Sequence, residues 1–163
     1  MSTQNRSTAL RIIVLVDGFD TEGLFGSLER MLRIRESELL LVFVRRTGPR
    51  RGLELAPRRP GGHELPPHRE RELADAEITG GTQALAEAEQ VASRMAARVE
   101  SRQLDGDPGR VVCELAKAER ADVVAVRGTG HDRPPVGPGS LGPIARFIVD
   151  HSPCPVLLLR DGG

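Results

Sequence analysis

The sequence predicts an α/β fold in which helices cover both faces of a parallel β-sheet. Short runs of β-branched and aliphatic residues alternate along the chain with segments whose apolar residues recur every three or four positions. Alternation of this kind is typical of parallel sheets. The apolar runs are continuous, as in LRIIVLV at residues 10–16, which indicates strands that are covered on both faces.

The first strand, helix and second strand should form a right-handed βαβ unit. A strand over residues 10–16 ends abruptly at Asp17, and Asp20 or Thr21 can cap the helix that follows. The second strand is expected over residues 38–45, ELLLVFVR. The apolar face of the intervening helix consists of Leu24, Phe25, Leu28, Met31 and Leu32.

Residues 46–69 differ in composition from the rest of the chain, since they are rich in arginine, proline and glycine and poor in apolar side chains. Such a segment buries too little surface to offset the entropy of ordering, which predicts a flexible insert. Residues 1–8 are polar and predict a disordered tail, which leaves one domain over residues 9–163. The charge of the insert could contact nucleic acid. However, all but one of the 23 basic residues are arginine, so a solvated linker is the simpler interpretation.

After the insert, a polar helix is expected from about residue 70, with an interruption at Gly80-Gly81 and a restart at Thr82. It should lead into a weak strand over residues 99–104, whose glutamate and arginine content is unusual for a sheet. The helix face that packs on the sheet is predicted to comprise Leu85, Ala88, Ala92, Met95 and Val99.

The pattern of residues in the last third of the chain predicts a ligand site. A turn at Gly106-Asp107-Pro108 opens a helix, and strands over residues 121–126 and 155–159 flank a loop crowded with glycine and proline. A short amphipathic helix over residues 144–151 lies between them. A glycine-rich turn between a parallel strand and a helix is where α/β folds bind phosphate, because free backbone N–H groups converge there. Ligands bind at strand carboxyl ends where the connections reverse direction.

Composition excludes several classes of protein. The formal net charge is zero and the pI is near 6.9, which argues against an obligate nucleic-acid binder. No long apolar run and no leader-like N-terminal segment is present, so we expect a cytoplasmic protein without a membrane partner. Cys113 and Cys154 lie in apolar runs and are expected to be buried thiols, without metal-ligand spacing. Trp and Tyr are absent, so a bound base would rest on aliphatic side chains or on one of four Phe.

Four pieces of sequence in the same order resemble the universal stress protein (UspA-like) family. They are IIVLVDG followed by Thr21, the strand ending in VFV, GDPGRVVCELAKAERADVVAV, and the ending HSPCPVLLLR. The resemblance covers most of the chain except its tail and insert. It implies a Rossmann-like sheet (adenine nucleotide alpha hydrolase-like) of five parallel strands in the order 3-2-1-4-5. It also implies a homodimer through strand 155–159, which would otherwise be an exposed apolar edge.

Many members of that family bind ATP through a loop written G-x2-G-x9-G-[S/T]. In this sequence Arg127 occupies the first glycine position and Gly130 the second. An arginine crowds a place where glycine allows close backbone approach, yet its guanidinium can pair with phosphate. The alternative is a degenerate loop that holds no ligand.

The end of the motif allows two registers. In the first register Gly142-Pro143 is the last pair of the motif, and eleven residues separate it from Gly130. In the second register Gly139-Ser140 is the last pair, eight residues separate it from Gly130, and the helix that follows gains nearly a turn. Pro143 has neither an N–H group nor a hydroxyl, whereas Ser140 has both. A lost charge-assisted hydrogen bond is worth roughly 1.5–3 kcal/mol, or about ten- to a hundredfold in affinity.

The resemblance implies that Asp17 contacts the nucleoside and that Val44 meets adenine. Alternatively, Asp17 caps the following helix and Val44 is plain sheet core. Val126, at the end of the fourth strand, completes the predicted set of binding residues.

The resulting prediction is a dimeric regulatory module of the stress response with an altered ATP or AMP site, Mg²⁺ accompanying ATP. No Ser/His/Asp or Cys/His set has credible spacing, so slow hydrolysis of bound ATP is the most enzymatic activity expected. A nucleotide-free module of the same fold that recognises a protein partner is the alternative. Nucleic-acid binding through the insert is a more remote one.

Overall fold

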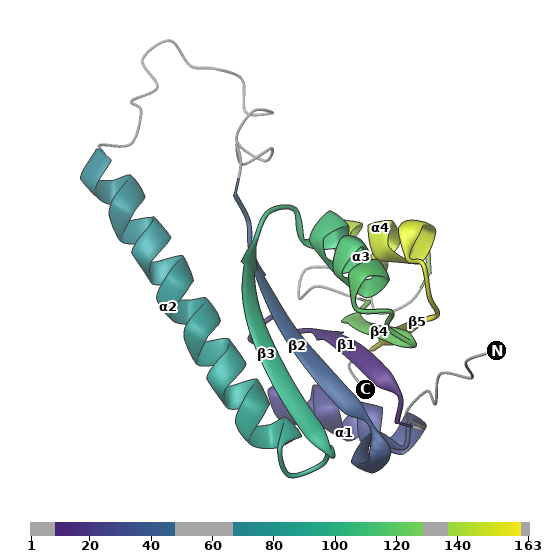
Figure 1. Ribbon diagram of the computed structural model, residues 1–163. Helices are drawn as coiled ribbons and strands as arrows, with labels where there is room; N and C mark the ends of the chain where they lie inside the picture. Colours follow the sequence, from purple (N-terminus) through teal and green to yellow (C-terminus); the bar gives the residue numbers. More distant parts are fainter. Residues whose placement is uncertain (1–8, 48–66, 129–136, 161–163) are drawn as a thin grey trace, which may run out of the picture.

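The computed structural model describes residues 9–47, 67–128 and 137–160, and these form a parallel sheet covered by helices (Figure 1). The five strands lie in the order β3-β2-β1-β4-β5, which confirms the predicted topology. They are β1 (Arg11–Leu15), β2 (Glu38–Arg45), β3 (Arg98–Asp105), β4 (Val123–Arg127) and β5 (Val156–Leu159). Within the described ranges, no helix has both the length and the apolar character that crossing a membrane requires.

Two helices lie on each face of the sheet (Figure 1). One apolar cluster joins the sheet to α1 and α2, and a second joins it to α3 and α4. The helices are α1 (Thr21–Met31), α2 (Pro67–Ala92), α3 (Pro108–Ala118) and α4 (Pro143–His151), with a 3₁₀ turn, η1 (Ile34–Glu36), after α1.

The central strand β1 accounts for the continuous apolar run near the start of the sequence. It pairs with β2 on one side and β4 on the other. Ile12 and Val14 pack toward α1 and α2, whereas Ile13 packs toward α3 and α4, and all three are fully buried. A strand with helices on both sides needs apolar residues at every position.

Aspartate residues cap the start of two helices, as predicted for Asp20. The carboxylate of Asp20 accepts a hydrogen bond from the Gly23 N–H at the start of α1. The carboxylate of Asp107 accepts one from the Arg110 N–H at the start of α3, with Pro108 in the first turn. Both bonds satisfy N–H groups that have no partner inside the helix.

The predicted interruption at Gly80-Gly81 is wrong, because α2 runs unbroken through both glycines. The helix also ends at Ala92, before the predicted residues Met95 and Val99, and the chain then turns into β3. At its other end α2 begins at Pro67, so the last residues of the predicted insert are helical. The remainder of the insert, 48–66, and the predicted tail, 1–8, lie outside the described residues.

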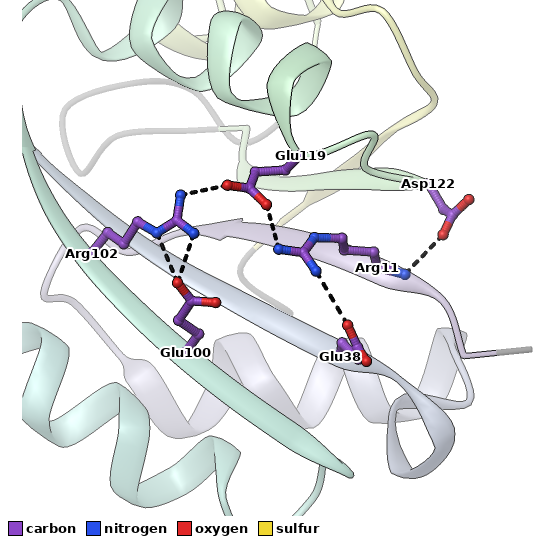
Figure 2. Close-up of polar contacts among 6 residues, drawn as sticks. All are labelled: Arg11, Glu38, Glu100, Arg102, Glu119 and Asp122. Atoms are coloured by element: carbon purple, nitrogen blue, oxygen red, sulfur yellow. Dashed lines mark hydrogen bonds and ion pairs between the residues drawn. The ribbon is translucent and has the colours of Figure 1, made fainter. Parts of the chain in front are cut away.

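The polar residues of β3 belong to an ion-pair network on the α3 side of the sheet (Figure 2). Glu119, which follows α3, pairs with both Arg11 and Arg102; its distance to Nη1 of Arg102 is 2.6 Å. Arg11 also pairs with Glu38 at 3.3 Å, and Arg102 with Glu100 at 2.7 Å. The hydrogen bond from Arg102 is the main cause that lowers the pKa of Glu119. The network therefore stabilises a face of β3 that the apolar core does not cover.

Candidate functional site

The carboxyl ends of β1 and β4 meet where the chain connections change direction. β1 leads into α1 on one face of the sheet, and β4 leads through a loop to α4 on the other (Figure 1). Neighbouring parallel strands whose connections leave to opposite faces produce the crevice in which open α/β sheets bind ligands. The predicted site residues Asp17 and Arg127 are on its two sides.

Arg127 reaches across this crevice to Asp17. Its Nε lies 2.9 Å from Oδ2 of Asp17, and the side chain of Arg127 is only 8% exposed, compared with 35% for Asp17. Its Nη2 donates to the carbonyl oxygen of Phe19 at 2.8 Å and to that of Asp20 at 3.3 Å. A carboxylate and two carbonyl groups of the β1–α1 turn thus surround the guanidinium.

The β1–α1 turn is shaped by local contacts that aim these oxygens at Arg127. Oδ1 of Asp17 accepts a hydrogen bond from the Phe19 N–H at 3.0 Å. Gly18 has φ 82 and Asp20 has φ 35, both in the left-handed region. Asp20 caps α1, so the alternative role considered for Asp17 belongs to Asp20 instead.

The two ends of the loop after β4 are held together. The Gly142 N–H donates to the carbonyl oxygen of Gly128 at 3.0 Å, and the Gly128 N–H donates to that of Leu159 at 2.8 Å. Gly139 has φ 80, and the Ser140 N–H donates to the carbonyl oxygen of Gly137 at 3.1 Å. Gly130, predicted as the second glycine of the motif, lies outside the described residues.

The start of α4 bears on the two registers of the motif. Gly142 is the N-cap and Pro143 the first helical residue, so the additional turn that the Gly139-Ser140 register implies is absent. Ser140 instead lies in a tight turn before the helix and is 3% exposed. The N–H groups of Ser140 and Gly142 are used within the protein. The Ser140 hydroxyl, for which we find no partner among the described residues, is the group of this turn that could bind a ligand.

Val44 and Val126 lie in the sheet core. Val44 is 8% exposed and Val126 3%, and both belong to the apolar cluster under α3 and α4. Val44 pairs in register with Leu104 of β3. Both side chains therefore pack in the core, and the predicted contacts of Val44 and Val126 with a nucleotide stay predictions.

Sequence reasoning missed Phe19. The residue is 54% exposed, although its backbone N–H donates to Asp17 and its carbonyl oxygen accepts from Arg127. A large exposed aromatic residue beside a charged crevice is unusual in a chain with only four Phe and no Trp or Tyr. Its position two residues after Asp17 was the available signal.

The cysteines and acidic residues provide no second site. Cys113 and Cys154 are free thiols, half-buried rather than fully buried as predicted. Burial raises the pKa of the Cys113 thiol. Among the described residues, no group of three or more His, Cys, Asp or Glu side chains is placed to hold a metal ion.

Comparisons with known proteins agree with the fold. The model of the family described as "Universal stress protein family" matches residues 9–160. UspA from Lactobacillus plantarum is 22% identical, with a TM-score of 0.67 over 93% of this chain and 97% of that one. A universal stress protein family protein from Arabidopsis thaliana with AMP bound is 19% identical, with a TM-score of 0.63 over 94% and 93%.

A third similar structure is the universal stress protein from Archaeoglobus fulgidus in complex with dAMP, at 16% identity. Its TM-score is 0.62 over 93% of this chain and 98% of that one. At these identities the solved structures establish the fold. A comparison with curated protein sequences finds no match to this chain.

Proposed function

This chain belongs to the universal stress protein family, and we propose that it is a regulatory module of the stress response that binds an adenine nucleotide in the crevice between β1 and β4. The observation that carries the proposal is the pairing of Asp17 with Arg127 at the point where the sheet connections reverse. That pairing brings a hydrogen-bond acceptor for ribose and a cation for phosphate into one crevice.

Each polar group of the crevice has a place in this proposal. The carboxylate of Asp17 would accept hydrogen bonds from the ribose hydroxyl groups. The guanidinium of Arg127 and the hydroxyl of Ser140 would contact phosphate oxygens, since an arginine fork matches phosphate geometry. The exposed ring of Phe19 offers the base an apolar surface next to Asp17.

The altered motif should weaken the hold on phosphate. Pro143 has no N–H group at the start of α4, and the Gly142 N–H is already bonded to Gly128. Each lost charge-assisted hydrogen bond reduces affinity by about ten- to a hundredfold. Binding of AMP, or of ATP together with Mg²⁺, is therefore expected at micromolar to millimolar concentration, without catalytic turnover.

Similar structures support the choice of ligand. The Arabidopsis protein is described with AMP bound and the Archaeoglobus protein with dAMP. Both ligands combine adenine with one phosphate, which is the combination that Asp17, Phe19 and Arg127 are suited to contact.

We further propose that the protein is a cytoplasmic homodimer formed through β5. This strand is the edge of the sheet, and it pairs only with β4 among the described strands. Three of its four residues are partly exposed and apolar. An apolar edge with unpaired backbone groups favours pairing with a second copy.

A specific observation favours the second candidate, a nucleotide-free module that recognises a protein partner. Arg127 and Asp17 already satisfy each other without a ligand, and Pro143 stands where a phosphate-binding residue would be useful. In that case the crevice would be a structural ion pair, and the function would depend on surfaces outside it.

The two candidates are separated by asking whether nucleotide binds and whether the crevice is responsible. Titration of the purified protein with labelled AMP or ATP should saturate between micromolar and millimolar nucleotide. Asp17→Asn and Ser140→Ala should each weaken binding by tenfold or more. Asp105→Asn is a matched control, because Asp105 also pairs with an arginine at a strand end, outside the crevice.

Absence of nucleotide binding up to millimolar concentration would reject the first candidate in favour of the second. Equal loss of binding in Asp105→Asn and Asp17→Asn would locate the ligand elsewhere.

A further inference from the structure

The guanidinium of Arg127 lies against the carboxylate of Asp17, the group to which we propose that the ribose binds. Its Nε bonds to Oδ2 of Asp17 at 2.9 Å, so the carboxylate proposed to hold the ribose is already engaged. Because the arginine side chain is only 8% exposed, this contact is largely shielded from water. The other oxygen, Oδ1, accepts from the Phe19 N–H, so a ligand that takes the hydrogen-bonding position of Nε on Oδ2 competes with Arg127 and displaces it.

The place in which the guanidinium lies is specific for a cation. Two carbonyl oxygens, those of Phe19 and Asp20, also line it, at 2.8 and 3.3 Å from Nη2. The turn that presents them is fixed by the hydrogen bond from the Phe19 N–H to Asp17 and by the left-handed conformation of Asp20. A planar fork of N–H donors fits such a set of acceptors better than a point charge does.

A second arginine–aspartate pair is more exposed to solvent than the pair of Arg127 and Asp17. Arg45 and Asp105, at the ends of β2 and β3, form a two-pronged contact at 2.8 and 2.7 Å. Their side chains are 23% and 52% exposed, more than those of Arg127 and Asp17. Breaking the Arg45 pair returns both groups to solvent, whereas breaking the Arg127 pair leaves a guanidinium with little solvent to accept its hydrogen bonds.

Ligand chemistry decides whether that displacement is favourable. Ribose hydroxyl groups can replace the guanidinium at Asp17, but they supply no negative charge to Arg127. A phosphate on the same ligand supplies it, since guanidinium–phosphate hydrogen bonds are charge-assisted and often two-pronged. A nucleotide thus exchanges one ion pair for another, while a nucleoside only breaks one.

We propose that Arg127 is the specificity-determining residue of the crevice: its side chain covers Asp17 and is displaced only by ligands that carry a phosphate. The proposal rests on nucleotide binding in this crevice. It assigns the site to nucleoside phosphates and excludes free nucleosides, although both have the same base and ribose.

Calorimetric titration of the full chain with adenosine and with AMP tests this directly. In the unchanged protein AMP should bind at least about tenfold more tightly than adenosine, the loss expected for one charge-assisted contact. In Arg127→Ala, adenosine should bind about 10- to 100-fold more tightly than before, because Asp17 is open, and AMP should gain far less. The ratio of the two dissociation constants should therefore fall at least tenfold.

Two further variants keep the test decisive. Arg45→Ala removes the comparable pair outside the crevice and should leave the ratio unchanged. Arg127→Lys retains the charge without the planar fork, so it should keep a preference for AMP while adenosine binds more tightly than in the unchanged protein. It also replaces Arg127→Ala as the test if the alanine variant does not fold.

The outcomes separate this inference from the proposed function. If the unchanged protein binds AMP and the Arg127→Ala ratio stays within threefold, the role of Arg127 is refuted and nucleotide binding stands. If only Arg127→Ala binds a ligand, Arg127 does close the site, and the nucleotide function of the unchanged protein is refuted. If neither protein binds adenosine or AMP, both proposals fail.

Discussion

Gly81 of α2 lies so close to Phe43 of β2 that a Cβ atom at position 81 would be 2.7 Å from Cδ1 of the ring. The side chain of Gln103 would be 2.9 Å away. One residue earlier, the corresponding point at Gly80 has no neighbouring atom within 4 Å. The two adjacent glycines are thus different: Gly81 lets the helix approach the sheet, and Gly80 faces open space.

Alanine substitutions should therefore have opposite effects at these two positions. Gly80→Ala should raise the free energy of unfolding by up to about 1 kcal/mol through helix propensity alone. Gly81→Ala gains the same propensity but overpacks the ring of Phe43, which costs about 1–3 kcal/mol, so a net loss is expected. Urea unfolding of both variants measures the difference. Equal stabilisation by the two substitutions would contradict this and would show that Phe43 moves aside at little cost in free energy.

Glu119→Gln should destabilise the protein at neutral pH by about 1.5–3 kcal/mol, because two arginines share this carboxylate and it is only 21% exposed. The pKa of Glu119 is lowered in the folded protein, chiefly by the hydrogen bond from Arg102. Its contribution is therefore complete above the ordinary glutamate pKa of about 4.3 and is lost as the pH falls below that value.

The stability difference between the unchanged protein and Glu119→Gln should accordingly shrink below about pH 4.3, as followed by denaturant unfolding across a pH series. Glu29→Gln is the control. Its ion pair with Arg35 is more exposed and should contribute less than about 1 kcal/mol. A difference that stays constant to low pH would mean that Glu119 acts through packing rather than charge.

The backbone of β5 allows the proposed dimer to be disrupted without disturbing the rest of the sheet. The carbonyl group of Pro155 accepts a hydrogen bond from the Val124 N–H of β4 at 3.0 Å, and that of Leu159 accepts one from the Gly128 N–H, directly after β4, at 2.8 Å. Backbone groups alternate in direction along a strand, so those of Val156 and Leu158 point away from β4, toward the open edge.

Leu158→Pro removes one outward N–H group and should convert the dimer to a monomer in analytical ultracentrifugation. Proline is tolerated on an edge strand whose N–H faces away from its neighbour, so the fold should persist by circular dichroism. Leu158→Ala shortens the same side chain but keeps the N–H group, and it should remain dimeric. A folded Leu158→Pro variant that still dimerises would place the interface elsewhere.

Cys113 should be a slow nucleophile at neutral pH. Burial raises its pKa above the ordinary value of 9.0, so little of the reactive thiolate forms near pH 7. In a Cys154→Ser background, the rate of alkylation by iodoacetamide should continue to rise beyond pH 9.0. The same protein in denaturant should react as an ordinary thiol and level off earlier. A native rate that levels off no later than the denatured one would contradict this.

Sequence periodicity predicted the strands well because burial imposes a simple pattern on them. β2 has the predicted bounds, and the continuous apolar run of β1 correctly indicated a strand with helices on both sides. The polar strand β3 could be located only approximately. Its glutamate and arginine residues belong to an ion-pair network that joins β1 and β3 to Glu119 after α3, and such long-range pairing leaves no local periodicity.

Errors in the prediction have similar causes. The glycines within α2 resembled a helix break, because nothing local indicates that Gly81 meets the ring of Phe43. At the site, Asp17 and Arg127 were identified individually from the family motif, but their direct contact depends on the shape of the β1–α1 turn, which no pattern in the sequence specifies. The contribution of the Phe19 and Asp20 carbonyl groups was invisible, since any residue type could supply it.

The central place of β1 also affects how the chain can be made. Arg11 and Asp122, which flank the pairing of β1 with β4, are 111 positions apart. At roughly 5–20 residues per second, a ribosome takes about 6–22 s to cover that interval, during which one side of β1 has no partner. Ribosome-bound chains that stop before residue 123 should therefore be cleaved rapidly by protease within β1, whereas chains extended past β5 should resist. Assembly of the sheet is in this sense a late event of synthesis, and the growing chain must be kept from aggregating until then.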